Sequence, residues 1–284
     1  NPGQLTFTES AKEYGLDDIS ASTGSYFFDG DSDGDLDLYL LNYPKEMAYS
    51  NKFVATPGPD GKLSFDEAPK DTFDSDRYYR NDFNTAKPGS KKFTDISQQA
   101  GIWNRAFGLS VSVTDFNRDG HPDIYVGNDF FQPDKLYINS GKGTFKDELS
   151  NYFRHCSQAT MGTDLSDFDN DGLVDLFAVD MMPPSNHRHK TLRTFNSNSF
   201  QVVLKQSNLF EPVTHNVLQR NNGNGTFSDI ACQAGVFRTD WSWSGLVTDL
   251  DNDGLKDIYV TNGYRRDFIN LDYSEFAKQL REGV

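Results

Sequence analysis

The sequence has few of the residues that build several common classes of protein. Among 284 residues there are two cysteines. Cys156 and Cys232 are too few for a disulfide scaffold and lack metal-site spacing, so they either pair or remain thiols. The apolar runs, such as "IYV" and "LYLL", have the length of strands, and none is long enough to cross a membrane as a helix. The chain begins at Asn1 without Met or an apolar leader, so we expect a processed or truncated piece.

Positive charge is scarce relative to negative charge. The chain has 27 Lys and Arg against 42 Asp and Glu, which gives a formal net charge of -15. Phosphate backbones are bound by clustered basic side chains, so this balance excludes nucleic acid as a partner. Aromatic residues make up 14% of the chain and apolar helical patterns are rare, which favours a sheet-rich globular protein.

The acidic residues are concentrated in a nine-residue pattern that occurs four times. It reads Asp-x-Asp/Asn-x-Asp-Gly-x-x-Asp, and its copies begin at Asp29, Asp115, Asp167 and Asp249. A strand-like run precedes each copy, and another follows at once, as in "DLDNDGLKDIYV". Two further strand-like runs complete the unit in three of the copies. Four short antiparallel strands per unit, repeated in series, are typical of a β-propeller.

The predicted fold is therefore all-β, with a β-propeller segment over residues 1–266 and a C-terminal helical extension over 267–284. The helix is expected from about Ser274, as an N-cap before "EFAKQLRE". Polar insertions near 45–75 and 183–211 are expected to be long loops on one face. The strands amount to about three complete blades and pieces of two more, so we expect a segment of a larger propeller of about seven blades.

The repeated loop has the composition of a calcium site. Calcium takes six to eight oxygen ligands, and closely spaced Asp side chains on a tight turn supply them. Gly at position 6 permits a positive φ, and the varied chemistry of position 7 suits a ligand that binds through its backbone carbonyl. The predicted ligands, for about four ions, are Asp29, Asp31, Asp33, Asp35 and Asp37; Asp115, Asn117, Asp119, His121 and Asp123; Asp167, Asp169, Asp171, Leu173 and Asp175; and Asp249, Asp251, Asp253, Leu255 and Asp257.

Other metals and other loops fit the pattern less well. An EF-hand needs flanking helices and a bidentate Glu at position 12, whereas position 12 here lies in a strand-like run. Zinc prefers His and Cys ligands, and magnesium prefers a stricter octahedron with several waters. Turns without an ion remain the alternative, but four groups of like charges would then repel one another without neutralisation.

The phrases around these loops resemble a known family. "FFDGDSDGDLDLYLLN", "PDIYVGNDF" and "DKLYINSGKGTF" are similar to the FG-GAP/VCBS repeats of the integrin α-chain propeller and of the cartilage acidic protein family. They look most like those of large surface propeller proteins of Bacteroidota. The resemblance implies an extracellular or outer-membrane-surface location, commonly with export or a lipid anchor, although no lipidated N-terminal Cys is present. For some members it implies an accessory role in TonB-dependent nutrient-uptake complexes.

We expect a non-enzymatic, calcium-stabilised propeller that binds a protein or a glycan at the cell surface. The runner-up is a carbohydrate-active enzyme such as a polysaccharide lyase, although no nucleophile elbow, phosphate-binding Gly loop or HExxH helix is present. Trp241 and Trp243 in "TDWSWSG" either stack on a sugar or pack between blades, and packing is favoured. Because propellers host many functions, the fold by itself does not name the ligand.

Overall fold

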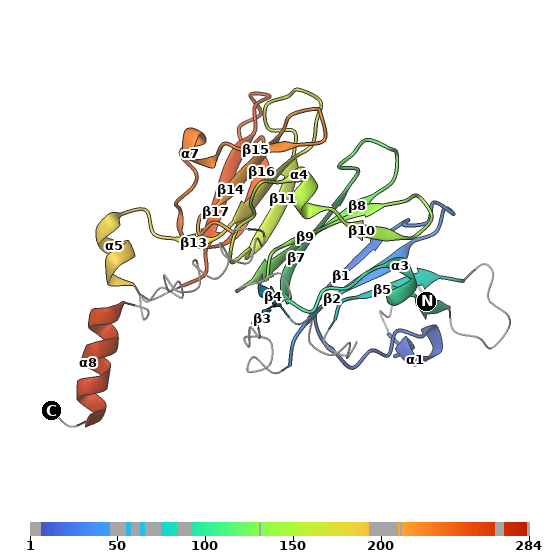
Figure 1. Cartoon of the computed structure of the whole chain (residues 1–284), viewed down its shortest axis with the longest axis horizontal. Coiled ribbons are helices and arrows are strands. Elements are labelled where there is room, and N and C mark those ends of the chain that lie inside the picture. The colour runs from blue at the N-terminus through green and yellow to red at the C-terminus, as the bar shows by residue number, and fades with distance from the viewer. Residues whose placement is uncertain are drawn as a thin grey trace.

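The chain folds into a series of antiparallel sheets that follow one another along the sequence, with β13 of the last sheet inserted between two strands of the third (Figure 1). The computed structural model describes residues 7–45, 55–57, 63–65, 75–83, 92–130, 132–192, 210, 212–264 and 270–282. Three sheets have four strands in the orders β1-β2-β5-β6, β7-β8-β9-β10 and β11-β12-β14-β15, and a fourth has the order β13-β16-β17. The prediction of an all-β fold made of four-stranded units is confirmed.

The strand bounds follow the predicted repeat. The first sheet has β1 (Ala21–Phe28), β2 (Asp37–Tyr43), β5 (Arg77–Asn81) and β6 (Phe93–Asp95). The second has β7 (Phe107–Thr114), β8 (Asp123–Asp129), β9 (Lys135–Asn139) and β10 (Phe145–Asp147). The third has β11 (Gly162–Ser166), β12 (Asp175–Val179), β14 (Val217–Asn221) and β15 (Phe227–Asp229). The fourth has β13 (Met181–Met182), β16 (Asp240–Thr248) and β17 (Asp257–Asn262).

Among the described residues, four short helices lie before or after a four-stranded sheet, and one lies between β13 and β14. They are α1 (Ala11–Tyr14), α3 (Ser97–Ala100), α4 (Leu149–Tyr152), α5 (Asn186–Thr191) and α7 (Ala231–Ala234). Three of them end on a left-handed glycine, namely Gly15, Gly101 and Gly235, with φ of 84°, 79° and 76°. Glycine adopts this conformation without steric cost, so the chain ends the helix there and turns toward the next sheet.

The core lies between consecutive sheets. Tyr39 and Leu41 of β2 pack in one buried cluster with Ile124 and Val126 of β8. A second cluster joins the second and third sheets, and a third joins the third and fourth. The first strands also meet, because β7 packs against β1 and β11, and β11 packs against β16. This face-to-face stacking covers both faces of the inner sheets, which explains why β12 is buried along its whole length.

Two sequence predictions about irregular regions need correction. The expected loop near 45–75 contains an antiparallel pair of strands, β3 (Ala55–Pro57) and β4 (Leu63–Phe65). The expected loop near 183–211 contains α5, whose N-terminus is capped by the hydroxyl of Ser185, which accepts the N–H of Arg188 at 3.2 Å. Local capping and cross-strand pairing therefore give regular structure to segments whose polar composition predicts none. Residues 46–54, 58–62, 66–74, 193–209 and 211 of these insertions lie outside the described residues.

The C-terminal helix starts earlier than predicted. Helix α8 spans Leu271–Glu282 and extends away from the sheets (Figure 1). Asn270 acts as its cap, because its Oδ1 accepts the N–H of Asp272 at 2.9 Å. Ser274 instead lies in the first turn and donates its hydroxyl to the carbonyl of Asn270 at 3.1 Å. No helix among the described residues is long and apolar enough to cross a membrane.

Candidate functional site

The four acidic loops occupy the same place in four sheets. Each is the turn between the first and the second long strand: β1–β2, β7–β8, β11–β12 and β16–β17. Position 4 adopts a left-handed conformation in every copy, with φ of 63° at Ser32, 63° at Arg118, 58° at Asn170 and 62° at Asn252. The glycine at position 6 has φ between 84° and 93°. The turn therefore has the same backbone conformation at positions 4 and 6 in all four copies.

The first Asp of each loop holds the turn closed. Asp29 accepts the N–H of Asp33 at 3.1 Å on Oδ1 and the N–H of Gly34 at 3.0 Å on Oδ2. The same two bonds recur at Asp115, Asp167 and Asp249. The carboxylate at position 5 in turn accepts the N–H of position 7 in all four copies. These bonds place position 7 by its backbone, as a carbonyl ligand requires.

The ninth residue joins the loop to the third strand of its sheet. Asp37, Asp123 and Asp175 are buried, and Oδ1 of each accepts a backbone N–H at 2.8 Å from an Asn that ends the third strand. These residues are Asn81, Asn139 and Asn221. Each Asn also donates its side-chain amide to the carbonyl of position 8. Sequence reasoning missed this role, although all three Asn stand at the end of the third strand-like run.

Burial shifts the acidity of these inner carboxylates. It raises the pKa of Asp123 to about 6, against hydrogen bonds from the backbone of Asn139 and Phe116 that lower it. Burial likewise raises the pKa of Asp175 to about 6. Neighbouring loop carboxylates act in the same direction as burial at both residues, because like charges disfavour ionisation. A cation at the loop would reverse that effect.

The geometry fits a hard cation. Carboxylate oxygens lie within 4.8 Å of one another in three groups: Asp29, Asp31 and Asp33; Asp167, Asp169 and Asp175; and Asp249, Asp251 and Asp257. The loop at 115–123, with Asn117 at position 3, does not form such a group. Oδ1 of Asp31 is buried and has no hydrogen-bond partner among the described residues. A buried carboxylate oxygen without a donor is costly unless a cation binds it, so the residues fit calcium.

Adjacent loops are also linked to one another. The amide of Asn139 in the second sheet donates to the carbonyl of Gly30 in the first loop at 2.8 Å. Oγ of Ser32 lies 3.0 Å from Nδ1 of His121 in the second loop. The amide of Asn170 in the third loop donates to the carbonyl of Gly254 in the fourth at 3.2 Å. The loops therefore connect neighbouring sheets as well as neighbouring strands.

A second repeated cluster lies at the opposite end of the sheets, after the second strand. Asp76 accepts the N–H of Asn42 at 2.8 Å, and Asp134 accepts the N–H of Asn128 at 2.8 Å. In the third sheet the two residue types are exchanged, and the N–H of Asp180 donates to Oδ1 of Asn216 at 2.7 Å. Burial raises the pKa of Asp76 to about 6 and that of Asp134 to about 7.

The remaining sequence candidates separate in the structure. Trp241 is 7% exposed and packs against Tyr264, with ring centroids 4.7 Å apart, whereas Trp243 is 45% exposed. The burial that packing between blades requires is therefore found for the first tryptophan and not for the second. Cys156 is buried and Cys232 is exposed, and both are free thiols.

Comparison with known proteins gives relatives for part of the chain. The model of an FG-GAP-like repeat matches residues 115–178 and 205–260. Cartilage acidic protein 1 of Xenopus tropicalis is 28% identical over 182 residues, which cover 62% of this chain and 24% of that protein. The Homo sapiens protein is 28% identical over 183 residues, which cover 62% and 23%. The chain thus spans about a quarter of the length of these curated relatives.

Among solved structures, an Agrocybe aegerita lectin, described as recognising non-reducing terminal N-acetylglucosamine, has a TM-score of 0.34 at 16% identity. It covers 85% of this chain and 60% of that chain. This likeness is too low to support a conclusion. The match to the family model, in contrast, covers the acidic loops at 115–123, 167–175 and 249–257. The chain therefore carries FG-GAP-like repeats and is homologous to cartilage acidic protein 1.

Proposed function

We propose that this protein is a non-enzymatic binding module whose sheets are held in place by calcium. The observation that carries the proposal is the turn conformation shared by all four loops, together with the carboxylates that converge in three of them. The predicted ligands at positions 1, 3, 5, 7 and 9 would hold the ion. Bound calcium neutralises the converging charges and fixes the turn. Position 9 then links the fixed turn to the third strand through its hydrogen bond to the Asn there. A rigid frame then presents loops to a partner.

Its setting is the extracellular face of a cell, and its partner is a protein or a glycan at that surface. The similarity to cartilage acidic protein 1 supports this setting, because free calcium suited to weak extracellular modules is available outside cells. Because the chain spans only part of those relatives, the role of the whole protein is itself part of the proposal. An accessory subunit of an outer-membrane nutrient-uptake complex is the specific form that we propose.

A non-enzymatic role agrees with the hydrogen bonds of the recurring carboxylates, which accept backbone N–H groups of their own sheet. Asp29 closes its turn through two backbone N–H groups, and Asp37 joins two strands through backbone N–H groups. Such carboxylates serve the frame and are not available for proton transfer to a substrate. Incubation of the protein with acidic and neutral polysaccharides should therefore release no shortened product. Depolymerisation that survives repurification and stops in an active-site variant would establish the lyase alternative.

Co-purification from native membranes tests the proposed partner. Membranes would be solubilised in mild detergent, and the protein would be captured once with calcium present and once with a calcium chelator. We expect a stoichiometric surface partner in the calcium sample and its loss in the chelated sample. A protein that is recovered alone under both conditions, and that carries no bound glycan, would contradict a surface binding role.

A further inference from the structure

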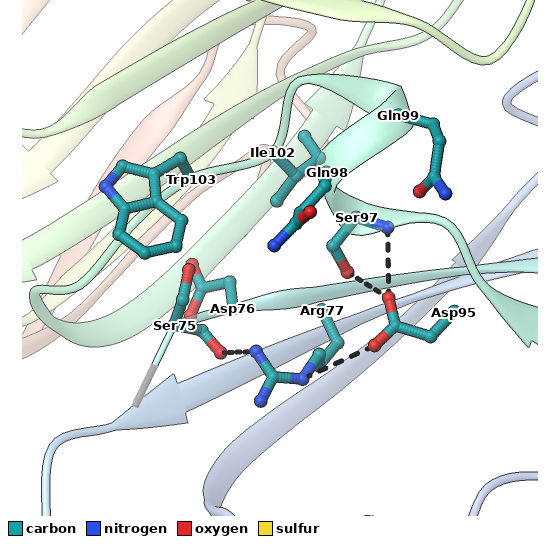
Figure 2. Close-up of a pocket in the computed structure, with 9 residues that line it drawn as sticks. All are labelled: Ser75, Asp76, Arg77, Asp95, Ser97, Gln98, Gln99, Ile102 and Trp103. Atoms are coloured by element: carbon teal, nitrogen blue, oxygen red, sulfur yellow. Dashed lines mark hydrogen bonds and ion pairs between the residues drawn. The ribbon is translucent and has the colours of Figure 1, made fainter. Parts of the chain in front are cut away.

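A polar cavity lies at the end of the first sheet that is opposite its acidic loop. Its volume is about 200 Å³, and its walls come from the start of β5, from α3 and from the link that leads to β7 (Figure 2). Arg77 forms its floor, Trp103 stands at one side, and Gln98 and Gln99 lie along the helix above. Strand β5 begins at Arg77 beside the cavity and ends at Asn81 beside the loop at 29–37, so calcium in that loop would leave the cavity open.

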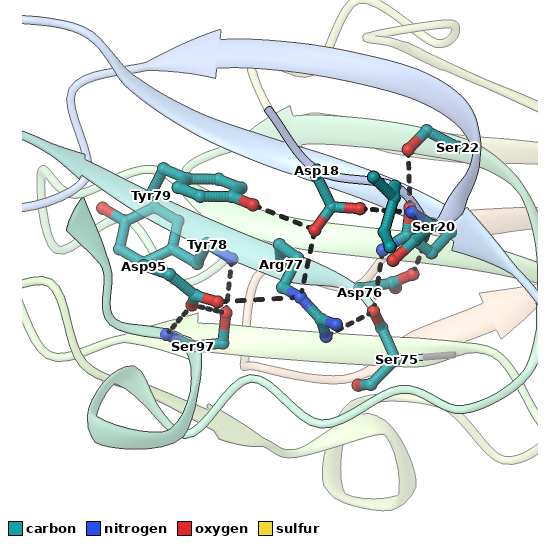
Figure 3. A network of polar contacts seen from close by, with 12 residues as sticks. Asp18, Ser20, Ser22, Ser75, Asp76, Arg77, Tyr78, Tyr79, Asp95 and Ser97 are labelled. Carbon is teal, nitrogen blue, oxygen red and sulfur yellow. Dashed lines mark hydrogen bonds and ion pairs between the residues drawn. The ribbon is translucent and has the colours of Figure 1, made fainter. Parts of the chain in front are cut away.

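The arginine of the cavity is buried and fixed. Arg77 is 7% exposed, and its Nε lies 3.5 Å from Asp18 and 3.6 Å from Asp95 (Figure 3). Its Nη1 donates to the carbonyl of Ser75 at 2.9 Å. Tyr79 donates its hydroxyl to the same Asp18 carboxylate at 3.1 Å. A guanidinium held on several sides keeps its position, which is what a preorganised binding site requires.

A residue of the second sheet, Tyr137 of β9, binds the chain at Trp103. The hydroxyl of Tyr137 donates to the backbone carbonyl of Trp103 at 2.7 Å and accepts its backbone N–H at 3.3 Å, so it fixes the backbone at this residue. Tyr137 itself is 1% exposed, so it is a rigid anchor. The indole of Trp103 is half-buried and borders the cavity. It therefore offers an aromatic surface, on an anchored backbone, beside polar groups.

Charge and hydrogen bonding exclude several classes of ligand. One guanidinium stands among the carboxylates of Asp18, Asp76 and Asp95, so an anion meets net repulsion. A metal ion finds no available carboxylate pair, because Asp76 already accepts from Tyr39, Asn42 and Asn104. An apolar ligand would strand the buried polar groups that line the walls. A neutral ligand rich in hydroxyl groups remains.

We propose that this cavity binds one sugar ring of a glycan. Hydroxyl groups donate to carboxylate oxygens and accept from guanidinium and amide N–H groups, so they match both kinds of wall. Among the described residues, Nη2 of Arg77 and the exposed amides of Gln98 and Gln99 make no hydrogen bond and are available. The apolar face of the ring packs on Trp103. The volume equals that of about seven waters, which suits a single ring.

The other sheets show that the combination is particular to the first. The position of Arg77 is taken by Lys135 in the second sheet, where Nζ pairs with Asp147 at 2.8 Å. In the third sheet it is taken by Val217, and the equivalent Asp229 pairs with His155 at 3.0 Å. A buried donor fork next to an aromatic wall thus distinguishes the first sheet. The sugar site rests on the glycan form of the proposed function.

The test uses the calcium-bound protein and a panel of methyl glycosides of hexoses, N-acetylhexosamines and pentoses. Binding would be followed by saturation-transfer NMR, with sorbitol as a polyol that has no ring face. We expect at least one glycoside to bind with a dissociation constant on the order of 1 mM, and sorbitol not to bind. Trp103→Ala should weaken binding about tenfold, and Gln98→Ala about fivefold.

Trp243→Ala is the matched control, because it removes a 45% exposed indole of another sheet and should leave binding unchanged. Gln98 is exposed, so its variant keeps the test valid even where Trp103→Ala fails to fold. Failure of every glycoside to bind, or unchanged binding in both cavity variants, overturns the sugar site. Either result leaves the calcium response and the co-purified partner intact, so failure of the sugar site is distinguishable from failure of the proposed function.

Discussion

The ninth residue of the acidic loop is buried in the three complete sheets and exposed in the last sheet. In the first three sheets the ninth residue of the loop is buried, with exposed fractions of 1%, 0% and 1% for Asp37, Asp123 and Asp175. In the fourth sheet Asp257 is exposed and accepts the N–H of Leu250 at 3.0 Å, with no Asn of a third strand beside it among the described residues. The turn geometry is nevertheless the same, with φ of 89° at both Gly120 and Gly254.

This contrast separates two contributions of the loop. Positions 1 to 7 form a self-contained turn, because their hydrogen bonds run within the loop and survive without a third strand. Position 9 connects the turn to the rest of its sheet, and only a complete sheet gives it that partner. The loop of the last sheet therefore shows the turn stabilised by its own hydrogen bonds alone. The other three loops show the turn also bonded to the third strand of its sheet.

Removal of calcium should have the largest effect. An ion bound by the native state alone stabilises it by about 2.7 kcal/mol at a hundredfold excess over its Kd, so several sites add up. We expect a chelator to lower the midpoint of thermal unfolding by more than about 10 °C, measured by calorimetry. Because Asp257 is exposed and lacks the link to a third strand among the described residues, we expect the loop at 249–257 to lose its ion first. An unchanged midpoint in chelator would contradict the role of calcium in both regions.

The ninth residue should matter more in a complete sheet. Asp175→Ala leaves the buried N–H of Asn221 and the partly buried N–H of Phe168 without an acceptor, so we expect a loss of about 3 kcal/mol in the free energy of unfolding. Asp257→Ala, the matched control on an exposed site, should cost less than about 1 kcal/mol beyond any effect of the ion. Urea unfolding in chelator would measure the free energy of unfolding of both variants. Equal losses would contradict the structural role of position 9 in a complete sheet.

The buried carboxylates at the other end of the complete sheets predict a pH dependence. Burial raises the pKa of Asp134 to about 7, above its ordinary value of 3.8. The folded state therefore binds this proton more tightly than the unfolded state. The stabilisation is complete below the ordinary pKa and is lost as the pH rises through about 7. In chelator, stability should rise as the pH falls from 8 toward 5, by up to about 1.4 kcal/mol per pH unit.

Asp134→Asn removes this titration and should lower the slope over the same range, while Asp76, Asp123 and Asp175, whose pKa values burial raises to about 6, keep the remainder of it. The variant tests the slope, so a uniform loss of stability at every pH does not affect the outcome. Equal slopes for the variant and the parent protein would show that Asp134 remains ionised when buried. Its hydrogen bonds from Tyr125 and Asn128 favour ionisation, and they would then outweigh burial.

The glycine of the turn should have the smallest effect, and an equal one in the two regions. Gly172 has φ of 84° and Gly254 has φ of 89°, and a Cβ at either meets nothing within 4 Å. An alanine there costs only the left-handed conformation, about 1 kcal/mol. We expect Gly172→Ala and Gly254→Ala to lower the free energy of unfolding equally in urea titrations. A much larger cost at Gly172 would show that the turn also depends on its sheet.

The sequence predicted what is local and missed what joins distant segments. The turns were predictable because their spacing, glycine and acids lie within nine residues. The partnership of Asp37 with Asn81 was not, since the two residues are 44 apart along the chain and no local pattern pairs them. The cap of α8 at Asn270 was missed because Ser274 offers an equally good signal four residues later. Arg77 and Trp103 meet only through packing of two sheets.

The central claim is that all four acidic loops bind calcium, and metal content tests it most directly. The protein would be dialysed to equilibrium against buffer with calcium in excess of the protein, and bound calcium per chain would be measured by mass spectrometry. Our account predicts about four ions per chain, and one fewer in a variant with Asp249→Ala and Asp253→Ala. A chain that retains no calcium, or one whose calcium is unchanged in that variant, would contradict it.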